Sequence, residues 1–219
     1  MDESYFNLSI AKELESRLRA RGFLVVMTRS TDQEVNADDF DANNDGQSGA
    51  GDSGVRKPST RPRLTKCNRV SIVAADLVDV LVSLHVDGSS DPAVRGSRVW
   101  YAAGRPFGQL NQSLAALVYE ELEHQMRDVG YPWIGQGIVE TGDSVTAGSH
   151  AQLQQLLIGP DREGLKEPSA MPGVVVEVLT LTSDADAAFL ASEQGISTIA
   201  TALDQAIVRF VDASLRGAG

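Results

Sequence analysis

The sequence is short of several features that would narrow its class. Cys67 is the only cysteine, so no disulfide can form within the chain and its redox compartment is not indicated. No run approaches the ~18 consecutive apolar residues of a membrane-spanning helix. Met1 is followed directly by Asp2, Glu3 and a helical pattern, unlike a signal peptide. If the protein is exported, we expect its signal to lie outside this chain.

Basic residues are also scarce, with 19 Lys and Arg against 30 Asp and Glu and a net charge of -11. Phosphate contacts need clustered Lys and Arg, so this balance argues against binding to nucleic acid or an anionic surface. It leaves uncharged and peptide-like substrates open. The 219 residues, 42% of them hydrophobic, suffice for one α/β domain with a full core.

The central feature of the sequence is an apolar, β-branched run from Gly173 to Leu181, with Glu177 in its middle. Such a run predicts a strand buried on both faces, as found in parallel sheets. An ionised carboxylate in a dry strand is costly unless it is paired, lies near a metal or is protonated. Two interpretations follow: an edge strand with Glu177 turned to water, or a carboxylate held at a catalytic site.

Helical and strand patterns alternate along the chain. Strands are predicted at 23–28, 79–84 and 97–102, and helices at 4–21, 63–77, 108–127, 193–215 and directly after Ser183, which is placed as a cap. A helix followed at once by a buried strand is typical of a parallel α/β sheet. We therefore predict a single α/β domain over residues 1–219. Its central sheet is mostly parallel, helices cover both faces, and the first strand is missing.

A polar segment, residues 32–62, predicts a long surface loop or insertion. Within it, Asp41, Asn43, Asp45 and Asp52 have the spacing of the oxygen ligands in a calcium loop. The last of these positions favours a bidentate Glu, and no amphipathic helix clearly enters or leaves the loop. Calcium binding and a merely solvated loop both stay open.

His85 directly follows the predicted strand 79–84. Ligands of open α/β sheets bind beyond the carboxyl ends of strands, so His85 and Glu177 could both reach one crevice, where the loop-rich residues 130–172 would shape a substrate groove. A neutral imidazole is a common zinc ligand, and a nearby carboxylate can act as general base. A histidine here equally suits a structural hydrogen bond. Serine or cysteine catalysis has less support, because no Gly-x-Ser-x-Gly elbow is present and Cys67 lies in a helical pattern.

Four stretches of the sequence carry motifs that occur together in one known family. They are the start of the first helix at Glu3–Leu8, the Thr-Arg-x-x-Asp segment within Val25–Asp32, the Arg helix with the Ser-x-His strand within Arg69–Asp87, and the glutamate strand within Pro172–Asp184. In these stretches the chain resembles the zinc-dependent N-acetylmuramoyl-L-alanine amidases. These are cell-wall hydrolases of bacteria and their phages, and they include autolysins. The match covers nearly the whole chain.

The resemblance implies roles for individual residues. Glu3 and His85 match zinc ligands of the family, and Glu177 matches the catalytic glutamate that activates the zinc-bound water and assists the departing amine. The bond cut would be the amide between N-acetylmuramic acid and the L-alanine of the peptidoglycan stem peptide. Peptidoglycan would be the partner, and the location would be extracellular, periplasmic or in the cell wall. The oligomeric state is not implied.

The chain also departs from the family pattern. The first zinc histidine of the family, in a Gly-His-Gly segment, would precede Glu3 and has no counterpart here, while Ala74 replaces a common Asn and the insertion at 32–62 is longer than usual. His150 is an alternative ligand, although it lies in a Gly-Ser loop. We expect an amidase domain truncated at its amino end. The alternatives are a non-catalytic relative that binds peptidoglycan or a regulatory partner, and another zinc exopeptidase of similar architecture.

Overall fold

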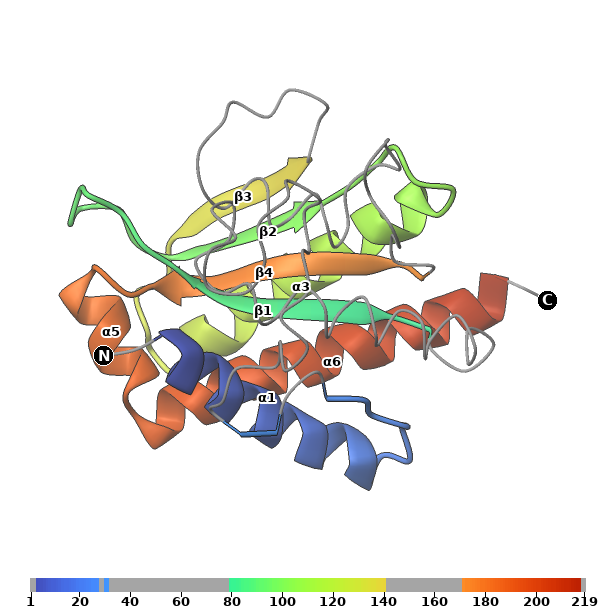
Figure 1. The fold of residues 1–219 in the computed structure, drawn as a ribbon, viewed down its shortest axis with the longest axis horizontal. Coiled ribbons are helices and arrows are strands. Elements are labelled where there is room, and N and C mark those ends of the chain that lie inside the picture. Colours follow the sequence, from blue (N-terminus) through green and yellow to red (C-terminus); the bar gives the residue numbers. More distant parts are fainter. Residues whose placement is uncertain (1–2, 28–29, 32–78, 141–170, 218–219) are drawn as a thin grey trace, which may run out of the picture.

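The computed structural model describes residues 3–27, 30–31, 79–140 and 171–217. Its elements in chain order are α1 (Glu3–Ala20), β1 (Leu81–Asp87), β2 (Ser97–Tyr101), α3 (Gly108–Asp128), β3 (Gly135–Glu140), β4 (Gly173–Thr180), α5 (Asp184–Leu190) and α6 (Glu193–Gly217) (Figure 1). They form one α/β domain. Among them, no helix is long and apolar enough to cross a membrane.

The described strands form a single mixed sheet in the order β1-β4-β2-β3 (Figure 1). β1 pairs with β4 in parallel, β2 pairs with β3 in parallel, and β2 pairs with β4 antiparallel. The sheet is therefore mostly parallel, as predicted. β4 lies inside the sheet with all of its residues buried, which agrees with its continuous run of Val and Leu.

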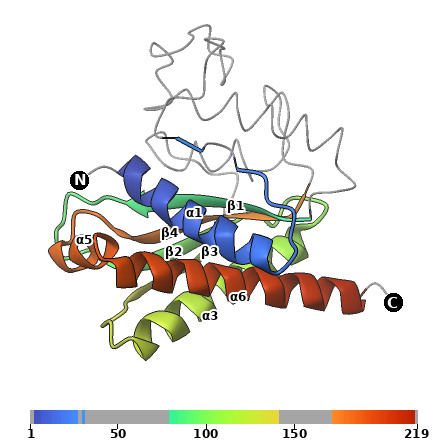
Figure 2. The ribbon, with the colours of Figure 1, turned by 90° about the horizontal axis from the view of Figure 1, so that it is seen from below.

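The hydrophobic core lies between the sheet and one layer of helices. α6 packs against both α1 and α3, and α3 and α6 lie on the same side of the sheet (Figure 2). The stripe that α3 turns inward recurs every four residues, at Leu114, Val118, Leu122 and Met126, all fully buried. Helices on both faces are predicted from the sequence, and the expected helix at 63–77 lies outside the described residues.

Alternate residues of each strand point into this core. Val174, Val176 and Val178 of β4, Val86 of β1 and Val99 of β2 belong to the main apolar cluster. Val175 instead contacts Leu81 and Trp100 in a separate small cluster. Because successive side chains of a strand point to opposite faces, Val175 and Glu177 lie on the face that points away from the helices.

One strand prediction is wrong, and another is confirmed with shifted bounds. The segment Phe23–Met27 keeps the alternation of a strand, with Leu24 71% exposed and Phe23 and Val25 half-buried, but it belongs to no strand of the sheet. Within the described residues it lacks a neighbouring strand to complete its backbone hydrogen bonds, although Arg19 donates to the Val25 carbonyl at 3.0 Å. The strand predicted at 79–84 is β1, which begins at Leu81 and extends to Asp87, so His85 lies within the strand and not after it.

β3 falls in a stretch predicted to be loop. Its sequence, Gly-Gln-Gly-Ile-Val-Glu, contains two glycines, which are rare in strands. A Cβ on Gly135 would lie 1.8 Å from the Tyr119 hydroxyl oxygen, so the close approach of Tyr119 requires glycine there. Gly135 is therefore a packing requirement of this strand, whereas Gly137 has open space around it and a positive φ of 95° that favours glycine.

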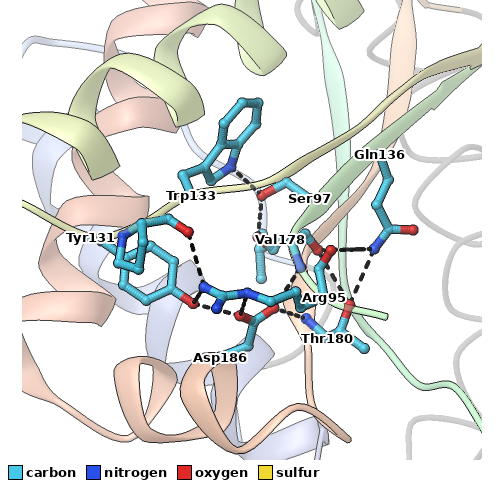
Figure 3. Close-up of polar contacts among 10 residues, drawn as sticks. Arg95, Ser97, Tyr131, Trp133, Gln136, Val178, Thr180 and Asp186 are labelled. Atoms are coloured by element: carbon cyan, nitrogen blue, oxygen red, sulfur yellow. Dashed lines mark hydrogen bonds and ion pairs between the residues drawn. The ribbon is translucent and has the colours of Figure 1, made fainter. Parts of the chain in front are cut away.

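A buried carboxylate joins the ends of the strands near the candidate site. Asp186 of α5 is fully buried and accepts hydrogen bonds from the backbone N–H groups of Gly96 (2.6 Å) and Thr180 (3.0 Å) and from the Tyr131 hydroxyl (2.5 Å) (Figure 3). The Nε atom of Arg95 lies 3.3 Å from Oδ1 of the Asp186 carboxylate, where it forms an ion pair. These contacts hold the residue before β2 against the end of β4.

Ser97 makes a second link between the same strands. Its hydroxyl donates to the Val178 carbonyl at 2.7 Å and accepts from the Trp133 indole N–H at 2.8 Å (Figure 3). Ser183 occupies the N-cap position of α5 as predicted, although its side chain makes no capping hydrogen bond.

We expect Asp186→Ala to lower the free energy of unfolding by about 3–5 kcal/mol, because it leaves buried donors and the Arg95 cation without their acceptor. The matched control is Asp184→Ala, which removes an exposed acid at the start of the same helix and should cost less than about 1 kcal/mol. Urea denaturation of the three proteins checks this. Equal losses in the two variants would show that the Asp186 contacts do not hold the strands together.

Candidate active site

Three charged or titratable side chains form a row across the centre of the sheet. In the strand register, His85 of β1 is the partner of Glu177 in β4, and Glu177 is the partner of Arg98 in β2. Paired residues present their side chains on the same face. The neighbours Leu84, Val176 and Val99 point to the helices, so the row lies on the opposite face.

Glu3 joins this row from the first turn of α1. Its Oε1 lies 3.2 Å from His85 Nδ1 and 3.5 Å from the backbone nitrogen of Val86. The Asn7 amide donates to the same oxygen at 3.2 Å, from one turn further along the helix. His85 Nε2 lies 3.1 Å from the Ser83 hydroxyl, so both ring nitrogens have a partner.

Burial opposes the charged forms of both Glu3 and His85, but their mutual contact outweighs it. The hydrogen bond and positive charge of His85 lower the pKa of Glu3 below its usual value. The hydrogen bond that His85 makes to the Glu3 carboxylate and the negative charge of Glu177 raise the pKa of His85 above its usual value. The pair is therefore held together by charge as well as by geometry.

Glu177 is the most buried acid of the row, at 2% exposure. Burial raises its pKa to about 7; His85 and Arg98 act to lower it, while Asp87 and Glu3 add to the increase. Its buried Oε2 atom has no hydrogen-bond partner in the part of the chain that the structure describes. The interpretation of Glu177 as an edge residue turned to water is therefore wrong, because β4 lies inside the sheet.

The Glu3 and His85 pair has the donor chemistry of a zinc site. Two ligands at about 2.0–2.1 Å from a tetrahedral zinc stand roughly 3.3 Å apart, which is close to the 3.2 Å between Oε1 and Nδ1. The same distance also suits the hydrogen bond present here. A group of three His, Cys, Asp or Glu that could hold a metal is not found within the described ranges. The donors present thus match two ligands of such a site.

The structure brings together the residues predicted to form the catalytic site, Glu3, His85 and Glu177. The other candidate ligands cannot be placed: the calcium-loop residues Asp41, Asn43, Asp45 and Asp52, together with His150, lie outside the described residues.

Arg98 is a member of the row that the sequence reasoning missed. The signal was available in the strand Ser97–Tyr101, because Val99 and Tyr101 are the apolar positions of its alternation. Arg98 and Trp100 must then share the other face, beside Glu177 and Val175.

Comparison with known proteins gives a consistent result. Residues 1–209 match the sequence profile of the N-acetylmuramoyl-L-alanine amidase family. Among solved structures, the chain is similar to the catalytic domain of the amidase CwlV from Bacillus (Paenibacillus) polymyxa var. colistinus, with 20% identity and a TM-score of 0.62 over 96% of this chain and 85% of that one. No curated protein sequence matches the chain.

Two further amidases show the same likeness. The enzyme from Clostridium difficile 630 is 20% identical, with a TM-score of 0.64 over 97% of this chain and 85% of that one. Ami1 from Mycobacterium smegmatis is 20% identical, with a TM-score of 0.64 over 97% of this chain and 78% of that one. At these identities the likeness shows a shared fold.

The buried Glu177 predicts a specific dependence of stability on pH in metal-free protein. Its pKa is about 7 in the folded chain against an ordinary 4.5, so folding favours the protonated acid. The stabilisation of the fold by protonated Glu177 is fully present below the ordinary pKa and is lost as the pH rises through about 7. Glu177→Gln lacks the carboxyl and does not lose this stabilisation. The free energy of unfolding of the variant, minus that of wild type, should therefore increase by roughly 2–3 kcal/mol between about pH 5 and about pH 8.

Denaturant unfolding with a chelator present measures this difference. Glu123→Gln, an acid that is 42% exposed on α3, is the matched control and should follow the wild-type curve. Parallel pH curves for wild type and Glu177→Gln would contradict the burial of an unpaired acid.

Proposed function

The chain belongs to the N-acetylmuramoyl-L-alanine amidase family of peptidoglycan hydrolases, and we propose that it cleaves, with zinc, the amide between N-acetylmuramic acid and the L-alanine of the stem peptide. The observation that carries this proposal is the position of Glu177. A buried carboxylate with one unpaired oxygen lies directly beside a Glu3 and His85 pair that is spaced as two zinc ligands would be.

In the proposed site Glu3 and His85 would hold the metal. When bound, zinc supplies a Lewis acid that polarises the amide carbonyl and lowers the pKa of water. Asn7 and Ser83 orient the two ligands, because each contacts a donor atom or ring nitrogen of the pair. Such supporting contacts are a common feature of metal ligands.

Glu177 moves the proton in the proposed reaction. It takes one from the attacking water as a carbon–oxygen bond forms at the amide carbonyl. It then gives that proton to the nitrogen as the carbon–nitrogen bond breaks, which leaves the lactyl carboxylic acid and the free amine of L-alanine; the acid then loses its proton to solvent. A pKa of about 7 suits both steps, because a group near the working pH can accept and release a proton with similar ease.

The second candidate is a non-catalytic relative that binds peptidoglycan or a regulatory partner. It is favoured by one observation: the described residues bring together two zinc donors and no group of three. Stoichiometric zinc together with hydrolysis by the purified chain would exclude it. Under either candidate, we propose one domain over residues 1–219 with an insertion at 32–62, and a place of action outside the cytoplasm, at the cell wall.

Glu177→Gln tests the proposal at the proton-transfer step. The amide keeps the shape of the side chain but cannot accept the proton, so we expect kcat for release of stem peptide from peptidoglycan to fall by at least about 100-fold. Zinc content and the far-UV circular dichroism spectrum should stay unchanged. Glu123→Gln is again the matched control, and its turnover should equal that of wild type. Turnover by Glu177→Gln at the wild-type rate would refute the assignment.

A further inference from the structure

Arg98 has no role in the proton transfer, yet it lies directly opposite Glu177 on the same face of the sheet. Its side chain is 31% exposed, whereas Glu177 is 2% exposed. A cation that borders the reacting groups and also reaches the surface is well placed to contact substrate. The details of its surroundings show what kind of group it suits.

Gln136 of β3 fixes the position of the Arg98 guanidinium. The Gln136 amide nitrogen lies near three oxygen acceptors, namely the carbonyls of Arg95 (3.2 Å) and Gly96 (3.3 Å) and the Thr180 hydroxyl (3.2 Å) (Figure 3). With its nitrogen so placed, the amide must turn its oxygen the other way. That oxygen accepts a hydrogen bond from Arg98 Nη2 at 2.5 Å.

The Trp100 ring packs against the Arg98 guanidinium. The centre of the Arg98 guanidinium lies 5.3 Å from the centroid of the Trp100 ring, within the range of a cation–π contact. Trp100 is itself held on this face by contact with Val175. An arginine fixed by both an amide and an aromatic ring loses little conformational freedom when it binds a ligand.

The contacts with Gln136 and Trp100 do not neutralise the positive charge of Arg98. Gln136 is a neutral anchor, so it orients the cation without cancelling it. The nearest carboxylate, Asp87, has its Oδ2 3.9 Å from Nη1, which is too long for a hydrogen bond, while its Oδ1 accepts from the Gly88 N–H at 2.7 Å. Arg98 Nε is buried and has no acceptor among the described residues.

We propose that Arg98 is a specificity-determining residue that binds the free carboxylate of the stem-peptide residue following L-alanine. This proposal rests on the proposed function. Arg98 is the register partner of Glu177, and neighbouring strands lie about 4.8 Å apart, so the two residues start from adjacent points on the same face of the sheet. A residue step is about 3.8 Å, so a scissile amide held at Glu177 brings the next residue of the stem peptide toward Arg98. A guanidinium binds such a group with paired hydrogen bonds.

A pair of matched substrates tests this assignment. N-acetylmuramoyl-L-alanyl-D-glutamate, joined through the glutamate side chain, has the free carboxylate, and the D-isoglutamine compound has an amide in its place. We expect wild type to have the higher kcat/KM for the free acid. Arg98→Gln should lower kcat/KM for the free acid by about 10- to 100-fold, chiefly through KM, and change that for the amide by less than about 3-fold.

Two further variants separate recognition from structure. Arg98→Lys keeps the charge and should retain part of the preference for the free acid. Arg127→Gln, on an exposed part of α3 away from this face, should leave both substrates unchanged. An equal loss on both substrates in Arg98→Gln would overturn the proposal, since it would mean that Arg98 acts through Glu177 or the sheet. No loss on either substrate, or a wild-type preference for the amide, would overturn it as well.

A binding measurement makes failure of this inference distinguishable from failure of the proposed function. The dipeptide L-alanyl-γ-D-glutamate and its isoglutamine counterpart are titrated into wild type and Arg98→Gln by calorimetry. Tighter binding of the acid by wild type alone supports Arg98 recognition, whatever the turnover. If wild type cleaves a substrate but binds both dipeptides equally, the amidase assignment stands and the role of Arg98 falls.

Discussion

The rest of the site depends on one costly placement, the burial of the Glu177 carboxyl in the middle of an apolar strand. Removing an ionised carboxylate from water without a full set of partners costs several kcal/mol, and the fold accommodates this by raising the pKa of the group to about 7. On its two sides lie His85 and Arg98, which act to lower that pKa again. The acid is therefore poised between its two protonation states at neutral pH.

The remainder of the fold holds this row in place. The register of β1, β4 and β2 decides that His85, Glu177 and Arg98 lie side by side, because a slip of one residue would turn any of them into the core. The apolar face of the same strands fixes that register against the helices. Asp186 ties the end of β4 to the residue before β2, and the first turn of α1 delivers Glu3 to His85.

Much of this arrangement could be predicted from the sequence. The run around Glu177 is apolar on both faces, so a strand there and the anomaly of its acid could be recognised directly, while its central place in the sheet follows only from the pairing with β1 and β2. The pairing of His85 with Glu3 came from resemblance to a family, because no local pattern connects residues so far apart in the chain. Helices such as α3 and α6 follow from their periodic apolar residues.

Other features depend on contacts that a linear pattern does not contain. Gly135 of β3 is a glycine because the Tyr119 hydroxyl lies against it, and Gly137 has a positive φ; both glycines suggest a loop. Phe23–Met27 has a strand pattern, but pairing requires a neighbour, and none is present in the described part of the chain. Arg98 reads as an ordinary surface cation until the antiparallel pairing of β2 with β4 sets it opposite Glu177.

In the proposed site, Glu3 and His85 hold a catalytic metal beside Glu177. Anomalous diffraction on either side of the zinc absorption edge, from crystals grown with zinc, tests it most directly. We expect a zinc peak about 2.0–2.2 Å from both the Glu3 carboxylate and His85 Nδ1, and its loss in His85→Ala. Zinc bound elsewhere on the protein, with no peak at this pair, would contradict the proposed metal site.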